Sequence, residues 1–265
     1  MKEGNMGKCV KLQEITSYLD EMLKLQDFSS DCSNNGLQFE GKEVVKKIAF
    51  AVDGTAESFR KAAEVNADML FVHHGISWGS GYKRITGLDA ERIKLLAKND
   101  ISLYGVHLPL DAHAGIGHNA RLAAMAELCY IAPFGDYHGK KIGFRGELSS
   151  PVTTEELAKR IDLLLPSTGK FQIFGNPARM VSRVGIISGG GAYTEAFMEM
   201  KELSLECLVT GEMTHEAVSY AKEANVSVIR FGHYRSETPG VLAVMSDVKR
   251  YFDVDVEFLD LPTSF

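Results

Sequence analysis

The fold of this 265-residue chain is decided by residues 47–74, which read KIAFAVDGTAESFRKAAEVNADMLFVHH. Lys47 to Asp53 is a short apolar run, typical of a buried strand. Thr55 to Asn66 then carries apolar residues at the 3.6-residue period of an amphipathic helix. A second apolar run, from Asp68 to His73, returns to the pattern of a strand. Strand, helix and strand in this order predict a right-handed βαβ unit with parallel strands.

The same alternation extends outward on both sides of this unit. A helical pattern starts at Val10 and runs to Leu23. After residue 74 the patterns predict helices at 88–98, 119–128, 154–165, 194–201 and 215–224, and strands at 101–107, 144–148, 171–174, 184–188, 205–210 and 226–231. Thr238 and Pro239 predict a last helix, with Thr238 as N-cap and Pro239 at its first position, leading to Tyr251. The prediction is an α/β protein with mostly parallel sheets.

One stretch interrupts this alternation. From Pro133 to Gly146 the sequence has glycine-rich turns and no long apolar period. We interpret this stretch as a boundary between two α/β regions.

Composition argues against several classes of protein. The 29 Lys and Arg against 35 Asp and Glu give a net charge of −6, so no nucleic-acid partner is expected. No run approaches the ~20 apolar residues of a membrane span, so no membrane partner is expected. Residues 1–14 lack the apolar core of a signal peptide. The four cysteines, at 9, 32, 129 and 207, form no CxxC pair and are interpreted as reduced thiols of a cytoplasmic protein.

Imidazoles and carboxylates gather where the predicted strands end. Ligands bind at the carboxyl ends of the strands in open parallel sheets, because strand ends and helix starts converge there. The residues at these ends are Asp53, His73, His74, His107, Asp111, His233 and Glu237. Such side chains bind divalent metals. A mixed set of this size suffices for two ions about 3.5–4 Å apart, bridged by a carboxylate.

Each residue also has a simpler interpretation. Neighbouring side chains in a regular strand point to opposite faces, so His73 and His74 share a site only if the strand end twists at Gly75. Asp111 could be a turn residue, and Glu237 could favour a helix N-terminus by its charge. Residues 53–55 could be a strand-to-helix turn capped by Thr55. Because all of them fall at one sheet edge, we favour a metal site.

The same residues carry a family resemblance. The stretches that carry it are FVHHG (71–75), GVHLPLDA (105–112), VTGE (209–212) and GHYRSE (232–237), with NGLQ (35–38), VD (52–53) and GGG (189–191). In this order, over nearly the whole chain, they resemble the Nif-three-like dinuclear metal-centre family, also named GTP cyclohydrolase I type 2 homologues.

The resemblance implies a ligand set and an architecture. The metal ligands would be His73, His74, Asp111, His233 and Glu237. His74 and Asp111 would hold one ion, His73 and His233 the other, and Glu237 would bridge. Residues 1–128 with 229–265 would form the metal-binding domain, and 129–228 a related domain inserted in it. Relatives form hexameric toroids with the sites facing an internal cavity, which implies a homohexamer.

Other polar residues leave their alternatives open. Residues 188–191 (SGGG) could present backbone N–H groups to a phosphate, but they lack the phosphate-loop spacing and are interpreted as a tight turn. Glu212 could be a helix cap, an interdomain hydrogen-bond partner, a substrate contact or a proton donor. His107 could act as a general acid, support a metal ligand or cap its strand. We take His107 and Glu212 as the candidate catalytic residues. The histidines at 113, 118 and 138 lie in polar loops and are expected to be solvated.

Two functions remain in competition. The first is a metal-dependent hydrolase, GTP cyclohydrolase-like by resemblance, whose two ions lower the pKa of a water that attacks a nucleotide or phosphoester. The second is a non-enzymatic metal-binding regulatory or protein-interaction scaffold. The set of His and carboxylates accepts zinc, iron or manganese, so it does not specify the metal.

Overall fold

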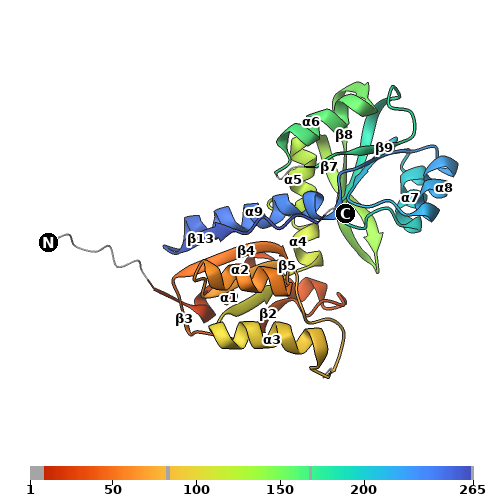
Figure 1. The fold of residues 1–265 in the computed structure, drawn as a ribbon. Helices are drawn as coiled ribbons and strands as arrows, with labels where there is room; N and C mark the ends of the chain where they lie inside the picture. Colours follow the sequence, from red (N-terminus) through yellow and green to blue (C-terminus); the bar gives the residue numbers. More distant parts are fainter. Residues whose placement is uncertain (1–8, 82–83, 167–168, 264–265) are drawn as a thin grey trace. The chain divides into compact units, whose positions relative to one another are not determined.

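The structure is a computed structural model that describes residues 9–81, 84–166 and 169–263. The chain divides into two compact units (Figure 1). The first runs up to Pro109 and resumes at Val241–Leu261, and the second is Leu110–Gly240 together with the residues that follow Leu261. Residues 110–240 are therefore inserted in the first unit. At both ends of this insertion the chain passes between the units within a helix, α4 (Leu108–Ala112) at the first and α9 (His233–Tyr251) at the second.

The first unit is a five-stranded sheet with helices on both faces. Its further elements are β1 (Val10–Lys11), α1 (Leu12–Met22), the 3-10 turn η1 (Leu25–Phe28), β2 (Gly36–Phe39), β3 (Val44–Val45), β4 (Lys47–Asp53), α2 (Ala56–Glu64), β5 (Met69–His74), α3 (Gly87–Asn99), β6 (Ser102–Gly105) and β13 (Asp255–Phe258). The strand order is β13-β4-β5-β6-β2, and only β2 runs antiparallel to its neighbour. This sheet confirms the predicted βαβ unit.

Alternation along the buried strands divides the core of this unit in two. Ala49, Ala51, Leu70 and Val72 pack with Phe59 of α2 and Leu96 of α3. The opposite face carries a row of rings, Phe50, Phe71 and Tyr104, whose neighbouring centroids lie 5.4 and 5.8 Å apart. Tyr104 donates its hydroxyl hydrogen to Asp20 of α1 at 2.8 Å, which ties α1 to that face. His73 and His74 end β5, and at this strand end their rings do not keep to opposite faces, since their centroids lie only 4.5 Å apart.

The second unit is built on a six-stranded mixed sheet. Its further elements are α5 (His118–Met125), β7 (Cys129–Tyr137), β8 (Lys140–Thr153), α6 (Thr154–Leu164), β9 (Gln172–Phe174), β10 (Met180–Ile187), α7 (Thr194–Glu202), β11 (Cys207–Thr210), α8 (His215–Glu223) and β12 (Ser227–Arg230). The order is β7-β8-β10-β11-β12-β9, with a parallel centre of β10, β11 and β12 and antiparallel flanks. The α/β class with parallel sheet centres is thus confirmed for both units.

The stretch interpreted as a boundary is a hairpin instead. Residues 133–146 belong to β7 and β8, which pair antiparallel across a turn at His138 and Gly139. The apolar period is missing because β7 is an edge strand with most of its residues exposed or half-exposed. Such a strand carries little of the hydrophobic alternation on which a prediction depends.

The start of the last helix was also wrongly predicted. Helix α9 begins at His233, and Pro239 lies inside it. Thr238 is not an N-cap, since its hydroxyl donates to the backbone oxygen of Tyr234 at 2.8 Å, one turn earlier. Gly232, with a φ of +96°, allows the chain to turn from β12 directly into the helix.

Within the described residues, no helix combines the length and the apolar character that a membrane crossing requires.

Candidate metal centre

Three histidines meet at the carboxyl end of the first unit's sheet. His73 and His74 end β5, and His107 follows β6 on the neighbouring strand. Their ring centroids lie 4.5 Å apart for His73 and His74, 5.3 Å for His73 and His107, and 5.8 Å for His74 and His107. One ring nitrogen of each lies within 4.8 Å of one ring nitrogen of the other two. The three imidazoles could therefore hold a metal ion.

Each of the β5 imidazoles is oriented by a bond at Nδ1. His73 Nδ1 lies 2.9 Å from the carbonyl oxygen of Val106, and His74 Nδ1 lies 2.8 Å from Asp53 Oδ1. A hydrogen bond at one ring nitrogen selects the tautomer and directs the other nitrogen, Nε2, toward a ligand. Asp53 therefore acts here as the partner of His74. Residues 53–55 also form the strand-to-helix turn that the sequence suggested, because Thr55 Oγ1 accepts a hydrogen bond from the Ser58 N–H and caps α2.

His107 is held by a carboxylate that sequence reasoning did not select. Asp31 Oδ1 lies 3.1 Å from His107 Nδ1, and Asp31 Oδ2 accepts from the Leu108 N–H at 3.0 Å. The Asp31 side chain is 1% exposed. Burial alone would raise the pKa of this carboxyl, but hydrogen bonds from His107 and Asn35 outweigh it and lower the pKa to about 2. Asp31 is therefore ionised at neutral pH.

A second group of ligand-type side chains lies in the second unit, at the start of α9. His233 and Glu237 are one helical turn apart, so they share a face, and Nε2 of the imidazole lies 3.1 Å from Oε1 of the carboxylate. On its other side, His233 Nδ1 lies 2.5 Å from Glu212 Oε1. Burial would lower the pKa of His233, but the carboxylates of Glu237 and Glu212 together raise it to about 10. The two carboxylates thus favour a positive charge at this place, whether a proton or a metal cation supplies it.

The glycine loop after β10 passes close to this group. Gly189 has a φ of +55°, and a Cβ atom built on it would lie 2.1 Å from Glu237 Oε1 and 3.0 Å from His233 Nε2. Its backbone N–H donates to Ser236 Oγ, and its carbonyl oxygen accepts from the N–H groups of Gly211 and Glu212. Residues 188–191 thus form a tight turn, as the sequence indicated. Because Gly189 has no side chain, the loop leaves room for His233 and Glu237.

Asp111 lies in α4, where Ser188 donates a hydrogen bond to its Oδ1 at 3.1 Å. His118, at the start of α5, offers a ring nitrogen within 4.8 Å of the Asp111 carboxylate. The expectation that His118 is solvated was wrong, since its side chain is fully buried and its Nδ1 accepts from the Gly240 N–H at 3.1 Å. Its sequence neighbours are polar, and Gly240 of α9, more than 100 residues later in the chain, approaches its ring closely.

The donor chemistry of both groups fits a divalent metal. Imidazole nitrogens and carboxylate oxygens are the ligands that zinc, iron and manganese accept. The partners at Nδ1, namely the Val106 carbonyl, Asp53, Asp31 and Glu212, are of the kind that orients metal-binding histidines in proteins. Asp53 and Glu212 were selected from the sequence, whereas Asp31 was not, because its sequence neighbourhood indicates only a turn.

Fold and side chains together define an α/β protein whose groups of histidines and carboxylates could hold metal ions. Residues 10–264 match the Duf34/NIF3 (NGG1p interacting factor 3) family. The chain belongs to this family, which confirms the resemblance.

Relatives match over almost their whole length. A protein of Pyrococcus horikoshii named GTP cyclohydrolase 1 type 2 homolog is 45% identical over 251 residues, which cover 94% of this chain and 98% of that relative. A protein of Archaeoglobus fulgidus with the same name is 41% identical over 257 residues, which cover 96% of this chain and 100% of that relative. Among solved structures, TTHA1606 from Thermus thermophilus has a TM-score of 0.84 at 34% identity and covers 97% of this chain and 100% of its own. The fold is thus that of NIF3 proteins.

Proposed function

We propose that this protein is a dinuclear metal-dependent hydrolase with His73, His74, Asp111, His233 and Glu237 as ligands. The observation that carries the proposal is that the Nδ1 atoms of all three ligand histidines have an acceptor within 2.9 Å. An imidazole so oriented loses little freedom when its Nε2 takes a metal. The family resemblance assigns His74 and Asp111 to one ion, His73 and His233 to the other, and Glu237 to the bridge.

The ions, once bound, would lower the pKa of a coordinated water toward neutral and polarise an oxygen of the substrate. The chain's own residues would position the ligands and move protons. Asp53 and Glu212 hold the rings of His74 and His233 through Nδ1. His107, held by Asp31 beside the His73 and His74 rings, is our candidate for the proton carrier. Glu212 remains a catalytic candidate as well, and its bond to His233 supports a positioning role.

We propose a nucleotide or another phosphoester as the substrate. The support is the name that the relatives carry, GTP cyclohydrolase 1 type 2 homolog, together with a site of the kind that promotes attack by water. We further propose that the protein is cytoplasmic and forms a toroidal homohexamer, as the family resemblance implies. For the domains we propose 1–128 with 229–265 as the metal-binding domain and 129–228 as the inserted one.

Elemental analysis of purified protein tests the centre. Wild type should contain about two divalent ions per chain, and His74→Ala and Glu237→Ala should each lose metal. His215→Ala is the matched control, because it removes an exposed histidine from the start of α8, outside both groups. Metal that survives both ligand substitutions would refute the ligand set.

A turnover screen separates enzyme from scaffold. Metal-loaded wild type is incubated with nucleoside phosphates and phosphoesters, and Glu237→Ala should abolish any hydrolysis. The family description names an interacting factor, which supports a non-enzymatic scaffold as the second candidate. Full metal content without turnover on any substrate, and a partner that still binds Glu237→Ala, would favour that candidate.

A further inference from the structure

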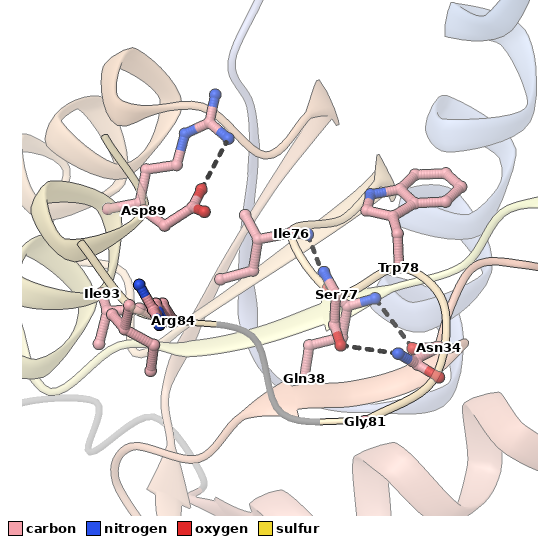
Figure 2. A pocket seen from close by; sticks show the side chains of 11 residues that line it. Asn34, Gln38, Ile76, Ser77, Trp78, Gly81, Arg84, Asp89 and Ile93 are labelled. Carbon is pink, nitrogen blue, oxygen red and sulfur yellow. Dashed lines mark hydrogen bonds and ion pairs between the residues drawn. The ribbon is translucent and has the colours of Figure 1, made fainter. Parts of the chain in front are cut away.

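The first unit contains a pocket that the metal ligands do not occupy. Its volume is about 300 Å³, and it opens beside the loop that follows β5 (Figure 2). We call it the Trp78 pocket. The side chains that characterise it are Asn34, Ile76, Trp78, Arg84, Arg92 and Ile93.

The wall of the pocket is held by a dense set of hydrogen bonds. Gln38 Oε1 accepts from the N–H groups of Ile76 and Ser77, at 2.8 and 3.1 Å. Asn34 Nδ2 donates to Ser77 Oγ at 2.8 Å and to the Gly79 carbonyl at 3.0 Å. These bonds join β2 and the segment before it to the loop after β5 (Figure 2). The pocket is therefore formed before any ligand arrives, which lowers the entropic cost of binding.

Trp78 connects the pocket with the histidines. Its indole Nε1 donates to the Gly75 carbonyl at 2.8 Å, which fixes the ring. The ring lies edge to face with His107 at a centroid distance of 5.1 Å, and it also lines the pocket. A planar ligand stacked on this indole would therefore lie next to the imidazole group. Ile76 and Ile93 add apolar surface for such a ring.

The charged side chains that line the pocket carry a net positive charge, although the chain as a whole is acidic. Two guanidinium groups line it, those of Arg84 and Arg92, against one carboxylate, that of Asp89. Arg92 Nη1 reaches Asp89 Oδ1 only at 4.0 Å, and both side chains are partly exposed, at 34% and 62%, so this pair is weak. Within the described residues no ion pair involves Arg84. In a chain of net charge −6, this local excess of positive charge favours an anionic group.

We propose that the Trp78 pocket binds a small planar anion: a heteroaromatic ring against Trp78 with one phosphate or carboxylate group on Arg84 and Arg92. The volume lies at the lower end of ligand pockets, ~300–1,000 Å³, which suits a ligand no larger than a nucleoside monophosphate. The idea that this ligand is also the substrate rests on the proposed function, whereas the binding of a planar anion to the pocket does not.

The fluorescence of Trp78 tests the proposal directly, because Trp78 is the only tryptophan of the chain. The full-length protein is titrated with GMP, AMP, guanosine, inorganic phosphate and pyridine-3-carboxylate, and calorimetry gives the affinities. GMP or AMP should change the fluorescence and bind about tenfold more tightly than guanosine, since the nucleoside lacks the charge-assisted bonds. Response to pyridine-3-carboxylate alone would assign the pocket to ring carboxylates.

Matched variants locate the binding. The double variant Arg84→Gln/Arg92→Gln should weaken binding about tenfold or more. Arg60→Gln, the same exchange at an exposed position of α2 outside the pocket, should leave it unchanged. Trp78→Phe, followed by calorimetry, should retain partial affinity. No response to any member of the panel, or equal affinity in the double variant with its thermal melt intact, would overturn the proposal.

Metal content keeps the two proposals apart. Arg84 and Arg92 are not members of the histidine groups, so their substitution should leave the metal content unchanged. A protein that holds metal but binds no planar anion would refute only the proposal for the Trp78 pocket. A protein that binds a planar anion but holds no metal after reconstitution would refute only the proposal of a metal centre.

Discussion

Gly189→Ala tests whether the glycine loop makes room for the metal ligands. The new Cβ would lie 2.1 Å from Glu237 Oε1, whereas real Cβ atoms essentially never approach closer than 3.0 Å. Glu237 would therefore have to retreat by roughly 1 Å, and metal sites tolerate about 0.2 Å. The φ of +55° adds roughly 1–2 kcal/mol for a residue with a side chain. We expect loss of metal and a Tm lower by about 2–8 °C.

The assays are elemental analysis after reconstitution and thermal unfolding of the metal-free protein. Gly190→Ala is the control, because a Cβ at Gly190 meets no atom within 4 Å and its φ is outside the left-handed region. Gly190→Ala should keep both the metal and the Tm of the wild type. If Gly189→Ala keeps its full metal content, the close approach of the loop to Glu237 has no functional consequence and the reasoning is refuted.

Three further predictions concern the residues around the two groups. Asp53→Asn and Glu212→Gln should each lower metal affinity about 10–100-fold in chelator competition, and an unchanged affinity would show that neither orients its histidine. Asp31→Asn should lower the free energy of unfolding by about 2 kcal/mol at pH 7, because the wild-type carboxyl has its pKa lowered to about 2. A carboxyl group whose pKa is lowered by folding stabilises the folded state at pH values above its unfolded pKa, and this stabilisation is lost on acidification. The difference in unfolding free energy between wild type and Asp31→Asn should therefore shrink between about pH 4 and pH 2, and a difference that stays constant in denaturation curves would contradict the prediction. Gly75→Ala, whose Cβ would lie 2.2 Å from Gln38 Oε1, should cost about 1–3 kcal/mol in urea denaturation through the lost bonds of Gln38, and an unshifted midpoint would exclude this role.

The sequence predicted the elements whose burial is periodic. The apolar runs that became β4 and β5 and the period of α2 are local patterns, and so is the position of His73 and His74 at the end of a strand. Edge strand β7 was missed because its exposed residues leave no such period. The strand β13 was missed as well, since its one exposed and three half-exposed residues show no apolar alternation and depend on pairing with β4.

Partners across long sequence separations were the other limit. Nothing near Asp31 indicates that it will hold His107, because the contact exists only once β6 lies beside β2. The burial of His118 likewise depends on α9, far along the chain. Residue type and strand position can thus suggest candidate ligands, whereas the residues that orient them follow from the tertiary fold.

The interrupted course of the first unit has a consequence for the order of folding during synthesis. Its sheet is complete only when Asp255 pairs beside Lys47, so the ribosome must release almost the whole chain before β13 can join β4. All six strands of the second unit's sheet lie within one continuous stretch, Leu110–Gly240. Closing its shorter loops costs less chain entropy. We expect the inserted unit to acquire its sheet first, while the nascent first unit stays incomplete, with the β4 edge open to other chains.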